Sequence, residues 1–146
     1  MSFPLAPALR IGSHAIVNQL KGGKYPLVLM LEPLLRCNLA CKGCGKIDYP
    51  DAILNRRLSY DECMDAIEEC GAPAVSIAGG EPLLHRDMPK IVEGYLARKK
   101  FVILCTNALL LKKKIDDYKP NGFFTWSIHL DGDQMMHDKS VCQDGV

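Results

Sequence analysis

The sequence predicts an α/β fold, a parallel sheet or barrel of about four strands with crossover helices. Two observations predict this class. Short apolar runs recur along the chain, and segments with apolar residues three and four positions apart separate them. Such an alternation of strands and helices makes neighbouring strands parallel, and each connection is long enough for a right-handed crossover.

The first half of the predicted sheet lies within residues 27–78. The apolar run Leu27–Leu31 predicts a strand over Leu27–Glu32 that is buried on both faces. Ser59 and Glu62 have the spacing of a capping box, so a helix should begin there and end at Gly71. Its buried side would carry Cys63, Met64, Ile67 and Cys70. A second strand is expected over Pro73–Ala78.

The second half repeats this order. The 3-and-4 spacing of apolar residues predicts a helix over Met88–Leu96. A third strand follows at Phe101–Cys105, a short helix at Leu110–Tyr118 and a fourth strand at Phe123–Leu130. We expect the remaining residues, up to Val146, to form a short polar loop.

Residues 1–24 are expected to form an N-terminal arm, and residues 25–146 the domain. The arm has loosely helical apolar spacing, interrupted by Pro7 and Gly12, and Lys21–Lys24 resembles a linker. We expect the arm to pack on the domain. An amphipathic arm that faces lipid is the alternative.

The composition excludes several classes of protein. The formal net charge of +1 gives no electrostatic basis for binding nucleic acid. The run Leu27–Leu31 is far shorter than the ~20 apolar residues of a membrane span. No basic segment precedes an apolar stretch at the N-terminus, so no signal peptide is evident. We therefore expect a cytoplasmic protein.

Three of the seven cysteines carry the strongest chemical signal. Cys37, Cys41 and Cys44 have the spacing C-x3-C-x2-C and directly follow the first predicted strand. Thiolates at close spacing are the usual ligands of iron–sulfur clusters, and three ligands for four irons leave one iron open. A zinc site is the alternative, although no fourth cysteine or histidine stands nearby in the sequence.

Together with a second motif, this pattern resembles the radical S-adenosylmethionine superfamily. The second motif, Gly79-Gly80-Glu81-Pro82, follows the second strand and is similar to the family's GGEP motif, which holds the methionine amino group of the cofactor. The resemblance implies part of a (βα)6-type barrel. It also implies a [4Fe–4S] cluster on the three cysteines, S-adenosyl-L-methionine on the open iron, and cleavage of that cofactor to a 5′-deoxyadenosyl radical.

Polar residues at the ends of the third and fourth strands match the same pattern. Thr106 and Asn107 resemble the family's polar third-strand position, and Ser127, His129 and Asp131 alternate along the fourth strand. We expect these five residues to contribute to cofactor binding, because ligands of such folds bind at the carboxyl ends of the strands. One departure is Gly43, where the family commonly has an aromatic residue beside the adenine.

Longer segments are similar to the adenosyl-hopene transferases of hopanoid biosynthesis. They are Tyr25–Pro33, Cys41–Pro50, Leu104–Leu111 and Ser127–Gly132. This resemblance implies that the adenosyl radical adds to the alkene of hopene and gives adenosylhopane. It also implies an electron donor such as flavodoxin or ferredoxin, and leaves peripheral contact with the inner membrane open.

Radical addition to such an alkene leaves a tertiary carbon radical, which needs a hydrogen atom. Cys105 ends the third strand, and a thiol is a good hydrogen donor, so Cys105 is our candidate catalytic residue. The alternative is a small buried apolar side chain.

The family's members are longer than this chain, so we expect only the first four strands of the barrel, and no turnover by residues 1–146 alone. Another radical enzyme, a methylase or a peptide-modifying one, and a non-catalytic metal-binding fragment remain as alternatives.

Overall fold

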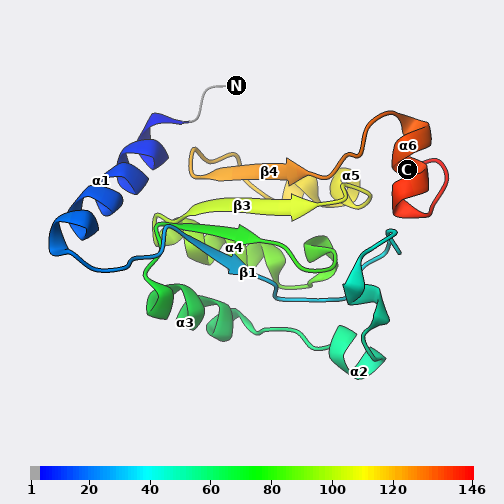
Figure 1. Ribbon diagram of the computed structural model, residues 1–146, viewed down its shortest axis with the longest axis horizontal. Coiled ribbons are helices and arrows are strands. Elements are labelled where there is room, and N and C mark those ends of the chain that lie inside the picture. The colour runs from blue at the N-terminus through cyan, green and yellow to red at the C-terminus, as the bar shows by residue number, and fades with distance from the viewer. Residues whose placement is uncertain (1–3) are drawn as a thin grey trace.

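The computed structural model describes residues 4–146 of the chain. Its centre is a parallel sheet of four strands in the order β1-β2-β3-β4 (Figure 1). The predicted α/β class is confirmed. The strands are β1 Val28–Leu31, β2 Ala74–Ile77, β3 Phe101–Thr106 and β4 Phe124–Ile128. The α-helices are α1 Leu5–Lys21, α2 Asp51–Leu54, α3 Tyr60–Cys70, α4 Met88–Ala97, α5 Leu111–Lys114 and α6 Gln134–Val141; the 3-10 helices are η1 Gly45–Asp48, η2 Pro82–Leu84 and η3 Ile115–Asp117.

The ends of α3 follow the sequence prediction. The Ser59 hydroxyl accepts a hydrogen bond from the Glu62 N–H at 3.2 Å, and the Glu62 carboxylate accepts one from the Ser59 N–H at 2.7 Å. This capping box satisfies N–H groups that have no partner within the helix. Gly71 ends α3 with φ of 70°, in the left-handed region that favours glycine.

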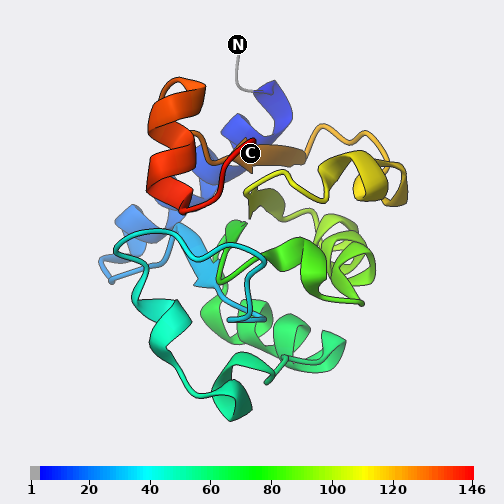
Figure 2. The same cartoon turned by 90° about the vertical axis from the view of Figure 1, so that its right-hand side faces the viewer.

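α3, α4 and α5 lie on one face of the sheet (Figure 2). The core forms between this face and the two longer helices, because alternate strand residues point toward them. Its fully buried side chains include Ile67, Val75, Ile77, Ile91, Tyr95, Val102 and Leu104. Cys63 belongs to this core, whereas Cys70 is only half-buried.

The opposite face of the sheet is open at β1. We predicted that this strand would be buried on both faces, and this prediction is wrong. Val28 and Met30 are 45% and 66% exposed, whereas Leu31, which points to the core, is 7% exposed. Among the described residues, β1 pairs only with β2, so it is an edge strand with one covered face.

The last part of the chain differs from the prediction in three ways. β4 ends at Ile128, so His129 and Asp131 lie in the loop after it. The expected third helix is one short turn, α5, followed by η3. The expected polar loop contains helix α6, whose first turn is capped by the Asp133 carboxylate accepting from the Met136 N–H.

α1 is continuous, although Pro7 and Gly12 were expected to interrupt it. Pro7 lies in the first turn, where an N–H has no helical partner and proline is tolerated. Gly22 ends the helix with φ of 73°. No helix in the part of the chain that the structure describes has both the length and the apolar character of a bilayer-spanning segment.

Candidate functional site

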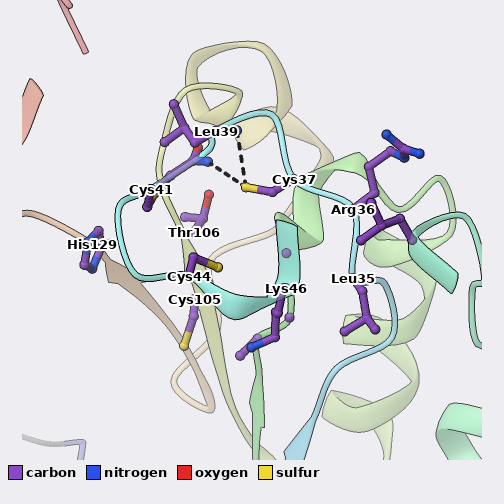
Figure 3. Close-up of a pocket in the computed structure, with 15 residues that line it drawn as sticks. Leu35, Arg36, Cys37, Leu39, Cys41, Cys44, Lys46, Cys105, Thr106 and His129 are labelled. Atoms are coloured by element: carbon purple, nitrogen blue, oxygen red, sulfur yellow. Dashed lines mark hydrogen bonds between the residues drawn. The ribbon is translucent and has the colours of Figure 1, made fainter. Parts of the chain in front are cut away.

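A cavity of about 460 Å³ lies at the carboxyl ends of the four strands. In parallel α/β sheets this edge is where ligands bind, because the loops after the strands converge there. Figure 3 shows side chains from three of these segments around the cavity: the cysteine loop after β1, the end of β3 and the loop after β4. The polar and sulfur-bearing lining comprises Arg36, Cys37, Cys41, Cys44, Lys46, Cys105, Thr106, Asn107 and His129.

The cysteine loop, residues 32–50, is fixed to the loop that follows β2. The Gly80 and Glu81 N–H groups donate to the carbonyl oxygens of Leu34 and Arg36, both at 2.9 Å. A Cβ atom on Gly80 would collide with the backbone carbonyls of Leu35 and Arg36. The glycine therefore permits two backbones to touch, and this contact sets the position of the loop that carries the cysteines.

Gly79, one residue earlier, also lies too close to the backbone of the cysteine loop for a Cβ atom. Its φ is 116°, and a Cβ atom there would collide with the Leu34 carbonyl oxygen. We expected the two glycines to let the backbone approach a ligand. Both line the cavity, but the close approach that the structure shows is to the cysteine loop.

The three cysteine thiols are free and half-buried along the cavity. The Leu39 N–H donates to the Cys37 sulfur at 3.4 Å (Figure 3). Burial raises the pKa of the Cys37 thiol; the Leu39 N–H opposes this rise and the nearby Glu81 carboxylate adds to it. Burial also raises the pKa of Cys41, and Cys37 adds to that rise. Metal binding at these thiols must therefore displace protons.

The donor set fits a [4Fe–4S] cluster with one open iron. The donors are three thiols from one loop, all facing one cavity, and thiolates are the usual ligands of such clusters. Within residues 4–146, no three histidine, cysteine or acidic side chains are gathered closely enough to hold a single metal ion. A cluster does not require that, since each thiolate takes a different iron.

Gly43, which precedes the third cysteine, has φ of 83° and is exposed. A side chain at this left-handed position would be strained, because its Cβ would crowd the backbone. The local backbone thus accounts for a glycine where the family pattern commonly has an aromatic residue.

The Glu81 carboxylate is fully buried and holds the end of β3. One oxygen accepts from the Thr106 hydroxyl at 2.8 Å and from the Leu83 N–H at 2.9 Å. The other accepts from the Asn107 N–H at 2.9 Å. Glu81 and Pro82 do not line the cavity. Their expected contact with the cofactor stays a prediction, and the contacts of Glu81 in the structure are with the protein itself.

Asn107 connects β3 to the cysteine loop. Its side-chain N–H₂ donates to the Asn38 side-chain oxygen at 2.9 Å and lies 3.8 Å from the Cys37 sulfur. Cys105, two residues earlier, also lines the cavity, and its sulfur lies 3.7 Å from the Ser76 hydroxyl of β2. The structure thus brings the candidate catalytic thiol into the same cavity as the cluster cysteines.

The loop after β4 supplies one further cavity residue, His129. Its N–H donates to the Thr106 carbonyl at 3.0 Å and extends the sheet by one bond. Its Nε2 lies 2.9 Å from an Asp131 oxygen, which also accepts from the Ser140 hydroxyl of α6. The Ser140 hydrogen bond, with a smaller contribution from His129, lowers the pKa of Asp131. Neither Asp131 nor Ser127 lines the cavity.

Sequence reasoning missed two residues that position this site. Asn38 and Ser140 belong to segments that we predicted as loops, and their partners lie far away in the sequence. The Ser140 carbonyl accepts from the Lys42 N–H at 2.8 Å, so α6 also supports the cysteine loop. Asp133, directly after Gly132, was the available signal for α6, because aspartate is a preferred N-cap.

Comparison with known proteins identifies the family. The model of the Radical SAM superfamily matches residues 31–142, so the chain belongs to this superfamily. The superfamily uses a [4Fe–4S] cluster and S-adenosylmethionine. These are the cofactors that the sequence analysis assigned to the cysteine loop and the cavity.

The curated relatives are named GTP 3′,8-cyclases, whereas the sequence analysis found a resemblance to adenosyl-hopene transferases. The chain is 31% identical over 102 residues to a GTP 3′,8-cyclase of Clostridium perfringens, covering 66% of this chain and 32% of that protein. It is 34% identical over 100 residues to a probable GTP 3′,8-cyclase of Methanococcus maripaludis, covering 66% and 33%. The chain thus spans about a third of the length of these relatives.

Solved structures share the fold. SuiB of Streptococcus suis bound to S-adenosylmethionine matches with a TM-score of 0.67 and 23% identity, over 91% of this chain and 31% of that one. SuiB bound to the precursor peptide SuiA matches with a TM-score of 0.70 and 20% identity, over 91% and 31%.

Replacing Gly80 with alanine should detach the cysteine loop from the loop after β2. The new methyl group would collide with backbone atoms, which cannot rotate away, so we expect a loss of about 2 kcal/mol or more in unfolding free energy. Urea unfolding of the chain measures it. Gly122→Ala is the control, because its Cβ would meet open space. Equal stability of both variants would contradict the role given to Gly80.

Replacing Glu81 with glutamine tests whether this side chain acts on the protein or on the cofactor. The amide would set an N–H₂ group against a backbone N–H, of either Leu83 or Asn107, and we expect a loss of about 2–3 kcal/mol in urea unfolding. Glu93→Gln, at an exposed position, should change little. Unchanged stability with weakened binding of S-adenosylmethionine would instead place Glu81 on the cofactor.

Proposed function

We propose that the chain forms the cofactor-binding part of an adenosyl-hopene transferase. This radical S-adenosylmethionine enzyme would join the 5′-deoxyadenosyl group to the alkene of hopene and give adenosylhopane. The observation that carries the proposal is the position of Cys105, which lines the cavity together with the three cluster cysteines. The four segments that resemble hopene transferases also support it.

Two sets of residues would bind the cluster and the cofactor. Cys37, Cys41 and Cys44 would hold the cluster. The backbone of Gly79 and Gly80, with Thr106, Asn107 and His129, would line the space for S-adenosylmethionine. When bound and reduced, this cofactor supplies the 5′-deoxyadenosyl radical.

Cys105 would complete the reaction by donating a hydrogen atom. Formation of the new carbon–carbon bond uses one electron of the alkene and leaves the other on a tertiary carbon of the substrate. The Cys105 S–H transfers its hydrogen atom to that carbon, which leaves a thiyl radical on the sulfur. One electron and one proton then restore the thiol, and an external donor of the flavodoxin or ferredoxin class would supply the electron.

The character of the surfaces around Cys105 favours an apolar substrate. Leu35, Leu39 and Leu54 line the cavity that Cys105 also lines. An apolar lining with a few placed polar groups is typical of sites for apolar ligands. An enzyme acting on such a substrate would work in the cytoplasm at the inner membrane, which dissolves it.

The names of the curated relatives make a GTP cyclisation the second candidate. A triphosphate requires several cations for binding. Of the described residues that line the cavity, the two with cationic side chains are already paired: Arg36 with Asp51, and Lys46 with Glu32 at 3.0 Å. This pairing favours the apolar substrate over the nucleotide.

An anaerobic assay separates the two candidates. The protein that carries this chain, at its full encoded length, is reconstituted with iron and sulfide and supplied with S-adenosylmethionine and a reductant. We expect adenosylhopane by mass spectrometry when hopene is added and no new product when GTP is added. A cyclised nucleotide, with no adduct from hopene, would contradict the proposal.

Replacing Cys105 with alanine should separate cofactor cleavage from completion of the product. We expect cleavage of S-adenosylmethionine to continue. The yield of saturated adenosylhopane should fall by about tenfold or more, which corresponds to ~1.4 kcal/mol in activation free energy. In D₂O the unaltered enzyme should place one deuterium on the substrate carbon, because the thiol hydrogen exchanges with solvent. Cys142→Ala, at an exposed position outside the cavity, is the control. Unchanged saturated product from the Cys105 variant would exclude the thiol as donor.

A further inference from the structure

α1 contacts the domain through a side that is not its most apolar one. Pro7 is buried, and Ile11, His14 and Asn18 are half-buried; their spacing of four, three and four places them on one side of the helix. His14 Nε2 lies 3.1 Å from the Pro26 carbonyl oxygen, and its ring meets Tyr25 edge-on. The orientation of α1 on the domain thus rests on a mixed polar and apolar side.

The opposite side carries an apolar row that is interrupted for one turn, at Gly12 and Ser13. Leu5, Leu9, Ile16 and Leu20, which we call the α1 stripe, are 73%, 63%, 63% and 82% exposed. Their spacing of four, seven and four aligns them over a length of ~22 Å, at ~1.5 Å per residue. A helix on the surface of a water-soluble domain normally turns such a row toward the core. Here the row faces outward.

Every charged side chain of α1 and of the residues that follow it up to Leu31 is cationic. The sequence contains no aspartate or glutamate before Glu32, whereas Arg10, Lys21 and Lys24 are present and exposed. Arg10 and Lys21 lie eleven positions apart, which is close to three helical turns, so both stand on the same side of α1, where they line a hollow between α1 and the domain together with Lys100. A helix with an apolar face, cationic side chains on one side of it and no carboxylate is suited to the surface of an anionic bilayer.

We propose that the α1 stripe binds the surface of a lipid bilayer that contains anionic headgroups. The charges favour this occupant over a second copy of the chain, because pairing two copies of α1 would bring together helices whose only charged side chains are cationic. The proposal does not depend on the reaction, since it rests on α1 alone.

The position of α1 agrees with such a contact. α1 lies beside the amino-terminal ends of the strands, at the opposite edge of the sheet from the cavity (Figure 1). Membrane binding through α1 would therefore leave the cysteine loop free. Leu27, Val28 and Met30, which follow α1 in the chain, are also exposed.

Sedimentation with lipid vesicles tests the proposal. The chain is mixed with vesicles of phosphatidylcholine and phosphatidylglycerol, or of phosphatidylcholine alone, and the bound fraction is measured at low and high salt. We expect binding to the anionic vesicles, weakened by salt because the cationic contribution is screened. The double variant Leu9→Ser/Leu20→Ser should reduce the partition coefficient by about tenfold or more, since two apolar side chains no longer enter the bilayer.

A matched control removes equally exposed apolar side chains elsewhere. Leu130 and Met135 are 70% and 76% exposed, outside α1, and Leu130→Ser/Met135→Ser should bind vesicles like the unaltered chain. Arg10→Gln/Lys21→Gln should lose the preference for anionic vesicles. Circular dichroism of every variant confirms an unchanged helix content.

Three results would overturn the proposal: no binding of the unaltered chain to anionic vesicles at low salt, equal binding by the stripe variant and its control, or a dimer in sedimentation that depends on the stripe and excludes vesicle binding.

Discussion

The site depends on one fully buried carboxylate. Glu81 accepts hydrogen bonds from the Thr106 hydroxyl and the Asn107 N–H, and so ties the loop after β2 to the end of β3. Its own N–H donates to the Arg36 carbonyl and holds the cysteine loop. A buried charge is tolerated only where its oxygens are satisfied, so these contacts must form together. One residue thus brings three strand ends to one place.

Asn107 links Glu81 to the cluster cysteines. The Glu81 carboxylate fixes the Asn107 backbone, and the Asn107 side chain meets Asn38 and the sulfur of Cys37. α6 supports the loop from the other side, through the bond from Lys42 to the Ser140 carbonyl. The loop that carries the thiols is therefore held at several points before any metal binds, and less ordering is left to the binding step.

Local sequence patterns predicted the helices, the strands and the cluster cysteines. They did not predict the contacts between segments that are distant in the sequence. Apolar periodicity located all four strands and the two long helices, because burial against one core imposes it. α6 was missed since Met135 and Met136 are exposed and its buried side is little more than His137 and Val141. The motif placed Glu81 near the site, but its partners lie some 25 residues away, and no spacing rule indicates which way a carboxylate turns.

The match to the curated relatives and the resemblance to hopene transferases differ in what they say about the substrate. The matched region covers about a third of the curated relatives and contains the cysteine loop and the glycine motif. Those features serve the shared cofactors, and a fold supports many reactions, so their match says little about the substrate. Cys105 is different, because neither the cluster nor the glycine motif requires a thiol there. Its place in the cavity bears on what happens after the radical forms, which is the step at which the proposed hopene adduct would need a hydrogen atom.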